Sequence, residues 1–128
     1  MLISIITPTY NREAFLPAAI ESVLAQSYKE FELIIVDDGS TDNSRELINT
    51  YAEKDSRIKY LYQENQRQSV ARNYALSVAK GDFICFLDSD NYWPSDKLEK
   101  SIKAFEVYPD ADIVYGDCIT IDEQGNEL

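Results

Sequence analysis

Two carboxylates, Asp88 and Asp90, directly follow an apolar run from Phe83 to Leu87. An apolar run of this length after Gly81-Asp82 predicts a central strand that is buried on both faces of a parallel sheet. If the extended backbone continues to Asp90, both carboxylates point to one side, about 6–7 Å apart. At an effective dielectric of about 20 they repel each other by roughly 2–3 kcal/mol. This repulsion favours a cation or a ligand at the carboxyl end of the strand.

Carboxylate oxygens in this arrangement suit Mg²⁺ or Mn²⁺, with water and substrate phosphates completing the coordination shell. Helix capping or plain solvation in a loop is the simpler alternative. An EF-hand loop that starts at Asp88 would place Glu99 at its twelfth position. We reject that loop because Tyr92 and Trp93 stand where it needs an oxygen ligand and a glycine.

The charged residues of the chain limit the chemistry that is open to it. Among its 128 residues are 12 basic and 23 acidic side chains, giving a net charge of −11, and there is no histidine. This length predicts one domain. The negative charge argues against a nucleic-acid-binding module, which needs a basic face. The lack of histidine excludes imidazole bases, Ser-His and Cys-His nucleophiles and the usual zinc sites.

Targeting signals and cysteines point to a reducing compartment. No apolar run approaches the roughly 18 residues that span a bilayer, and the N-terminus lacks the basic leader and cleavage site of a signal peptide. We therefore expect a cytoplasmic protein, or one peripheral at the inner membrane face in a full-length form. Cys85 and Cys118 both lie in apolar, strand-like segments, which predicts reduced core residues.

Apolar runs alternate along the chain with apolar residues at helical spacing. Strands are predicted at residues 2–7, with Pro8 ending the ladder, and at 31–36, 58–62, 83–87, 113–115 and 118–121, with a turn at 124–126. Four helices are predicted, and the third covers about residues 69–79. The apolar faces of the first, second and fourth are Leu16-Ala19-Ile20-Val23-Leu24, Leu47-Ile48-Tyr51-Ala52 and Leu98-Ile102-Phe105.

Local signals predict where the helices begin and end. Asn11 is a candidate cap ahead of the first helix, and Ser40 or Thr41 is a candidate cap for the second. Gly81 is expected to end the third helix as a left-handed C-cap. The fourth helix is expected to begin at Pro94-Ser95.

This alternation predicts an α/β fold with a mostly parallel central sheet flanked by helices. Ligands of such sheets bind beyond the carboxyl ends of the strands, at a switch point in the strand order. The candidate site segments are therefore residues 7–11, 37–41 and 88–91, and the polar stretch before the third helix approaches them.

Several candidates in these segments also have simpler interpretations. Asp37 to Ser40 fits a strand end followed by a glycine and a hydroxyl cap, although this leaves the two aspartates unexplained. Tyr10 fits either surface covering or a ring that stacks on a base, and Arg72 fits a salt-bridged surface residue. No GxGxxG follows the first strand and no Walker A motif occurs, which disfavours dinucleotide oxidoreductases and P-loop enzymes.

A set of short motifs resembles family 2 glycosyltransferases of the GT-A fold in order and spacing, over about Ile3 to Leu98. The resemblance implies that residues 1–128 form a single nucleotide-sugar-binding domain, the N-terminal part of a catalytic domain. The motifs are residues 5–12, 21–28, 36–42, 63–65, 71–73, 79–82 and 87–90.

The resemblance also implies roles for individual residues, with a UDP-sugar as the commonest donor. By position, Pro8 and Tyr10 would line the base and ribose, with Tyr10 stacked on the ring. Asp37 would accept a hydrogen bond from the base, and Arg72 would approach its carbonyl side. Asp88 would contact the ribose.

For the chemical step, the resemblance implies an inverting transfer to a saccharide or lipid-linked acceptor. Asp90 would hold the Mg²⁺ or Mn²⁺ that bridges the pyrophosphate and offsets charge on the leaving diphosphate. The family's acidic catalytic base belongs to an acceptor-binding half, so we expect it beyond Leu128. Neither Asp117 nor Asp122 matches that base by position.

The chain departs from the family pattern at several positions, which affects donor preference and the shape of the loops. Arg67 and Gln68 stand where the family often has glycine or small residues. Tyr74-Ala75 replaces a common X-Gly pair, and Asn91 replaces a frequent acidic residue.

Three alternatives stay open. A receiver domain has a similar length and an acidic pair, but it places the pair after its first strand and needs a lysine after the last one. Here the pair Asp37-Asp38 follows the second strand, and no lysine occurs after Lys103. A nucleotidyltransferase usually opens with a glycine-rich basic loop, unlike Thr7 to Tyr10. A fragment that binds nucleotide-sugar without activity of its own is the third.

Overall fold

A computed structural model describes residues 1–128 and contains four strands that alternate with four helices. This order confirms the predicted α/β architecture. None of the helices combines the length and apolar character needed to cross a bilayer. The elements are β1 (Ile3–Thr9), α1 (Leu16–Leu24), β2 (Phe31–Asp37), α2 (Ser44–Lys54), β3 (Ile58–Tyr62), α3 (Gln68–Val78), β4 (Phe83–Phe86) and α4 (Lys97–Val107).

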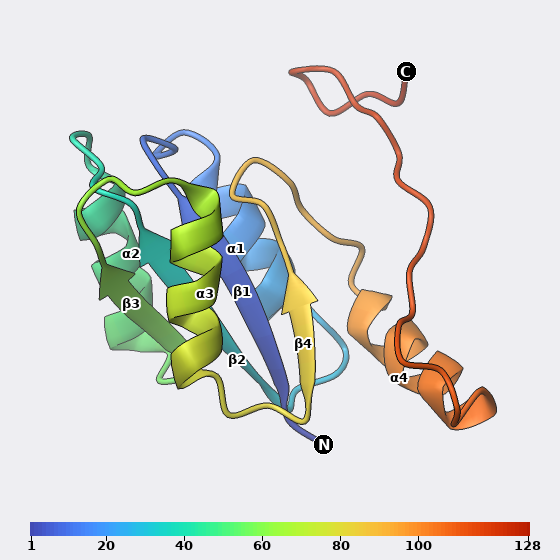
Figure 1. Cartoon of the computed structure of the whole chain (residues 1–128). Helices are drawn as coiled ribbons and strands as arrows, with labels where there is room; N and C mark the ends of the chain where they lie inside the picture. The colour runs from blue at the N-terminus through green and yellow to red at the C-terminus, as the bar shows by residue number, and fades with distance from the viewer.

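The four strands form one sheet in the order β3-β2-β1-β4, and every neighbouring pair is parallel. Ile5 of β1 lies between Leu33 of β2 and Cys85 of β4. The strand order reverses direction beside β1, so the carboxyl ends of β1 and β4 form a switch point (Figure 1).

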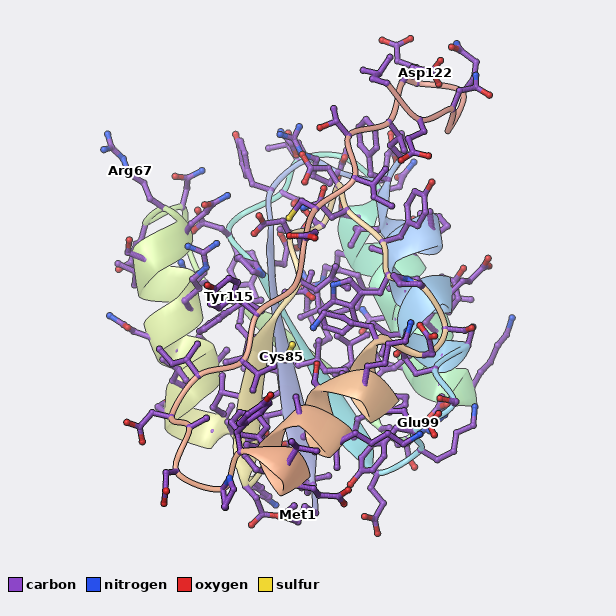
Figure 2. All side chains as sticks on the ribbon, turned by 90° about the vertical axis from the view of Figure 1, so that its right-hand side faces the viewer. Met1, Arg67, Cys85, Glu99, Tyr115 and Asp122 are labelled. Carbon is purple, nitrogen blue, oxygen red and sulfur yellow. The ribbon has the colours of Figure 1, made fainter.

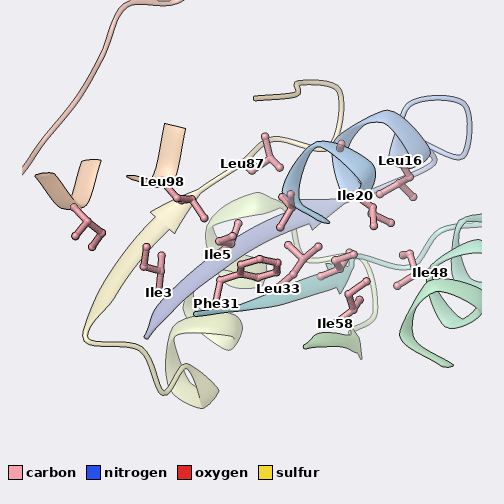
Figure 3. Close-up of a cluster of buried hydrophobic side chains, with 14 residues drawn as sticks. Ile3, Ile5, Leu16, Ile20, Phe31, Leu33, Ile48, Ile58, Leu87 and Leu98 are labelled. Atoms are coloured by element: carbon pink, nitrogen blue, oxygen red, sulfur yellow. The ribbon is translucent and has the colours of Figure 1, made fainter. Parts of the chain in front are cut away.

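Helices cover both faces of the sheet, because successive residues of β1 and β2 point to opposite sides. Ile5, Leu33 and Ile35 pack with residues of α1, α2 and α4 in a cluster of 14 buried side chains (Figure 3). Ile6 and Ile34 point the other way, toward α3. The predicted apolar faces of α1, α2 and α4 therefore lie against one face of the sheet, and α3 covers the other (Figure 1).

Pro8 does not end the first strand, as the sequence had suggested, but pairs with Val36 within it. Ile6 accepts a hydrogen bond from the backbone N–H of Leu87, on the β4 side. Pro8, two residues on, faces the same side, where β4 has already ended at Phe86. Proline has no backbone N–H, but at this position there is no neighbouring strand to which an N–H would donate, so no hydrogen bond of the sheet is lost.

β4 is an edge strand, so the prediction of a central strand buried on both faces is wrong. Phe83 and Cys85 pack against the larger core, whereas Ile84 and Phe86 are 41% and 50% exposed on the other face. The reason is that α3 packs over β1 and β2 and leaves this part of β4 uncovered.

The three predicted caps have other roles in the structure. Neither α1 nor α2 has a side-chain cap. Asn11 instead forms hydrogen bonds with Ser40 and Thr41, which join the β1–α1 loop to the β2–α2 loop. α3 ends at Val78 with Ala79 as its C-cap, and Gly81 lacks the positive φ of a left-handed cap. α4 begins at Lys97, three residues after the predicted start.

The segment after α4 forms no strand, so the strands predicted at 113–115 and 118–121 are wrong. A single bridge joins Ile121 to Glu127 around a turn at 123–125, which confirms the turn predicted at 124–126 with its bounds one residue earlier. Tyr115 is 91% exposed, and Figure 2 shows it on the segment that leads to Asp122. Strand-forming residues need a partner edge, and these residues do not pair with the sheet. Cys118 is consequently exposed, whereas Cys85 packs against the core; both thiols are free.

A buried polar network joins the amino ends of three strands on the α3 side. The Glu32 carboxylate is 5% exposed and accepts hydrogen bonds from Ser4 Oγ at 2.5 Å, from the Lys80 backbone N–H at 2.7 Å and from Lys59 Nζ. The backbone N–H of Gly81 in turn donates to Ser4 Oγ at 2.8 Å. The network ties the turn between α3 and β4 to the sheet.

We predict that Gly81→Ala destabilises the protein by about 2–3 kcal/mol because the turn has no room for a side chain. A Cβ at this position would lie 2.5 Å from the backbone nitrogen of Ser4 and 2.8 Å from the carbonyl oxygen of Phe83. Urea denaturation measures the loss. Gly116→Ala is the matched control, because a Cβ there meets nothing within 4 Å; equal stabilities of the two variants would contradict the prediction.

We predict that Glu32 makes the protein lose stability in acid. Burial opposes ionisation of Glu32, but the hydrogen bonds from Lys59 and Ser4 outweigh it and hold the pKa of the carboxyl below its ordinary value. The stabilisation is therefore present above pH of about 4.5 and is lost as the pH falls through the lower, folded-state pKa.

Glu32→Gln should lower the free energy of unfolding at pH 7 by about 2 kcal/mol and flatten its decline in acid. Urea titrations between pH 7 and pH 3 check both effects. The exposed Glu53→Gln is the control for loss of a charge. An unchanged acid decline in the Glu32 variant would contradict the assignment.

Candidate functional site

The loops that follow the strands meet at the carboxyl edge of the sheet and enclose a cavity of about 440 Å³. This arrangement is the one expected from the strand ends. The lining comes from the β1–α1 loop, the β2–α2 loop, the segment before α3 and the turn after β4. The lining residues are Pro8, Thr9, Tyr10, Asn11, Arg12, Asp38, Asn65, Arg67, Gln68 and Ser89.

Two of the predicted nucleotide-binding residues, Pro8 and Tyr10, lie in this wall. Tyr10 is 45% exposed, so its ring is available to a planar ligand. Thr9, between them, is buried, and its hydroxyl oxygen has no hydrogen-bond partner. Buried hydroxyls normally have a hydrogen-bond partner, so the unpaired hydroxyl of Thr9 stands out. Thr9 also lines the cavity, and the sequence analysis did not include it among the site residues.

Asp37 lies behind the wall. It is buried, and its two oxygens accept hydrogen bonds from the Ser40 backbone N–H and the Tyr60 hydroxyl, each at 2.9 Å. Burial and this hydrogen bond to the carboxylate raise the pKa of Tyr60. Asp37 thus holds the turn after β2 onto the neighbouring strand β3.

Asp38, not Asp37, is the aspartate of this pair that lines the cavity. Its carboxylate accepts hydrogen bonds from Gln63 Nε2 and the Gln66 backbone N–H, both at 2.7 Å, and from the Arg67 backbone N–H at 2.9 Å. The two successive aspartates therefore hold different loops, which explains why both precede the glycine.

The β1–α1 and β2–α2 loops are joined through Asn11, which adopts a positive φ of 49°. Asparagine tolerates this left-handed conformation better than most residues. Its side-chain oxygen accepts a hydrogen bond from the Thr41 backbone N–H at 2.8 Å, and its own N–H donates to Ser40 Oγ at 3.0 Å. The residues predicted as helix caps thus fix one wall of the cavity.

Gly39 allows the segment before α3 to lie directly on the β2–α2 turn. It has a φ of +79°, and a Cβ there would lie 3.0 Å from the backbone nitrogen of Asn65. Both the conformation and the close approach require glycine.

Arg72 and Asp88 are brought together. The Arg72 guanidinium donates a hydrogen bond to Asp88 at 3.0 Å and lies 5.7 Å above the Phe86 ring. Its Nε is buried without a partner. The ion pair fits the simpler interpretation of Arg72, and it also places a cation beside the switch point.

The prediction that Asp88 and Asp90 share one side of an extended strand is wrong. β4 ends at Phe86, and residues after it form a turn in which the Asn91 N–H donates to the Asp88 carbonyl at 3.0 Å. Ser89, between the aspartates, is buried against the cavity. Arg72 offsets the charge of Asp88, so no cation shared by the two aspartates is needed for this. Asp90 is exposed.

The protein contains no cluster of three or more acidic, cysteine or histidine side chains that could hold a metal alone. Mg²⁺ and Mn²⁺ sites often use only one or two carboxylates, with water and substrate phosphates as the other ligands. Asp90 is exposed, and its neighbour Ser89 lines the cavity.

The family described as Glycosyl transferase family 2 matches residues 4–128. An uncharacterised glycosyltransferase of Haemophilus influenzae is 45% identical over 128 residues, which are 99% of this chain and 51% of that protein. The chain thus spans about half the length of this relative.

Two solved structures share the fold. Residues 1–349 of S. aureus TarS, in complex with UDP-GlcNAc, match with a TM-score of 0.79 and 32% identity over 85% of this chain and 32% of that one. The mannosyltransferase PcManGT from Pyrobaculum calidifontis, in complex with GDP-Man and Mn²⁺, matches with a TM-score of 0.76 and 27% identity over 80% of this chain and 32% of that one. The sheet, its switch point and these matches agree: the chain belongs to glycosyltransferase family 2 and has the GT-A fold of its structural neighbours.

Proposed function

We propose that this chain is the donor-binding part of an inverting glycosyltransferase that uses a UDP-sugar and transfers the sugar to a saccharide or lipid-linked acceptor. The observation that carries the proposal is the cavity at the switch point, where the exposed Tyr10 ring and the Arg72–Asp88 pair flank the strand ends. The UDP-GlcNAc in the TarS complex supports a uridine donor. Membership of the family sets aside the receiver-domain and nucleotidyltransferase alternatives.

The proposed nucleotide roles are those that the family resemblance implies, and of these residues Pro8 and Tyr10 line the cavity. Tyr10 stacks on the base, and Pro8 lines the same wall. Arg72 turns toward a base carbonyl, for which its unpartnered Nε is a spare donor. Asp88, freed in part from Arg72, contacts the ribose. Asp37 serves the base through the second lone pair of an oxygen that already accepts one protein hydrogen bond.

The metal role falls to Asp90, whose exposed carboxylate supplies one oxygen ligand to Mg²⁺ or Mn²⁺. The bound metal would offset negative charge on the leaving diphosphate. The Mn²⁺ in the PcManGT complex supports this choice of ion. The protein has a net charge of −11, so a bound metal would add to the positive charge that Arg12 and Arg67 of the cavity lining offer a diphosphate.

The catalytic base lies outside residues 1–128 in this proposal, so this part of the enzyme binds donor without transferring it. Asp122 is no substitute, because its carboxylate holds its own turn through the Gln124 and Asn126 backbone N–H groups. The longer relatives have room for an acceptor-binding half. We also propose that the enzyme acts in the cytoplasm or at the inner membrane face.

We predict that UDP binds in a Mn²⁺-dependent way and that Asp90→Ala weakens this binding about tenfold or more, because the bridging metal loses its protein ligand. Isothermal titration calorimetry with UDP, with and without MnCl₂, measures both effects. Asp112→Ala removes an equally negative, exposed side chain from the segment after α4 and is the matched control. Absence of UDP binding, or binding indifferent to both Mn²⁺ and Asp90, would count against the proposal.

A further inference from the structure

Gln26 is a buried polar residue at the carboxyl end of α1, directly after the C-cap Ala25. Its amide has hydrogen-bond partners at both ends. Nε2 donates to the carbonyl oxygen of Ser22, within α1, at 3.0 Å and to the carbonyl oxygen of Pro94 at 2.7 Å. Oε1 accepts a hydrogen bond from the Leu98 N–H at 3.0 Å. One buried side chain thus joins the end of α1 to the segment in which α4 begins.

Gln26 provides the side-chain cap that α4 does not find at its own N-terminus. Asp96, the N-cap residue, makes no side-chain hydrogen bond to the helix. The first N–H groups of a helix have no partner within it, so an acceptor from outside stabilises the start of the helix. Leu98 is the second residue of α4, and its N–H donates to the Gln26 oxygen. The Ser27 N–H donates to the Ser95 carbonyl at 2.7 Å, so two successive residues after α1 fix the start of α4.

The loop that ends at this cap carries Asp90, the proposed metal ligand. Leu87 and Leu98 anchor the two ends of the loop in the larger buried cluster (Figure 3). Asp90 and the two residues after it are exposed, so the place of Asp90 depends on how the ends are held. Apolar contacts have no preferred direction, whereas hydrogen bonds do. The bonds from Gln26 therefore direct the backbone at Pro94, four residues from Asp90.

We infer that Gln26 is a positioning residue for metal-dependent donor binding: by holding the Pro94 carbonyl and the start of α4, it sets where the Asp90 carboxylate meets the metal. This inference rests on the proposed function. Gln26 is not among the residues that line the cavity, so it acts through the loop. It differs from a role in stability alone, in which the loss of Gln26 would have the same effect on UDP binding with or without Asp90.

A double-mutant cycle with Asp90→Ala tests the inference. Gln26→Met keeps the approximate size of the side chain and removes its hydrogen bonds. It should weaken UDP binding about fivefold in the wild-type background, because the Asp90 carboxylate is displaced from the metal. In the Asp90→Ala background it should cost less than about twofold, because no carboxylate is left to misplace. Calorimetry with UDP and MnCl₂ gives the four dissociation constants, at a temperature at which thermal unfolding shows all four chains to be folded.

Ile48→Val is the matched control for a loss of stability. Ile48 is fully buried in the same cluster but belongs to α2, away from the loop. Its substitution should lower the temperature of unfolding and leave the UDP dissociation constant unchanged. An equal loss of affinity for Gln26→Met in both backgrounds, or no loss in the wild-type background, would overturn the inference.

Gln26→Asn is a second variant, which keeps the amide but is one methylene group too short to reach both Pro94 and Leu98. If Gln26→Met does not fold, Gln26→Asn must show the same dependence on Asp90. If it lacks that dependence, or if neither variant folds, the inference is overturned, because Gln26 then serves folding rather than donor binding. A wild-type chain that does not bind UDP, or that binds it equally well after Asp90→Ala, overturns the proposed function as well.

Discussion

Parallel pairing of β1 with both β2 and β4 is the constraint on which the rest of the structure depends. It places the carboxyl ends of the strands at one edge, so that loops from distant parts of the chain meet there. The reversal of strand order beside β1 separates the loops after β1 and β4 and leaves space for a ligand. The buried cluster beneath the sheet keeps this pairing fixed, and Glu32 secures the opposite edge.

The site solves an electrostatic difficulty, since an acidic protein must hold an anionic donor. Most of the aspartates at the site already accept hydrogen bonds from the protein. Asp37 and Asp38 accept them from backbone N–H groups, and Asp88 accepts one from the Arg72 guanidinium. These hydrogen bonds stabilise the carboxylates and order the loops, and Arg72 also offsets the charge of Asp88. Asp90 is left exposed, which suits a metal brought together with the diphosphate.

Sequence patterns predicted the fold and the place of the site. The spacing of apolar residues indicates which faces of helices and strands are buried, and polar residues directly after apolar runs mark the strand ends where the site lies. They could not predict features that depend on neighbours in space. The exposure of Phe86 follows from where α3 lies, and the pairing of Pro8 follows from where β4 ends. The opposite directions of Asp37 and Asp38, and the positive φ of 74° at Arg67, depend on loops that no local signal describes.

The central claim is that the carboxyl edge of this sheet binds a nucleoside diphosphate. Two-dimensional ¹H–¹⁵N NMR during titration with UDP and Mg²⁺ tests it most directly, because every loop reports separately. The account predicts chemical-shift changes concentrated in residues 7–12, 37–41, 63–72 and 88–91, with the amino edge around Glu32 unaffected. Changes centred elsewhere, or none at saturating UDP, would contradict it.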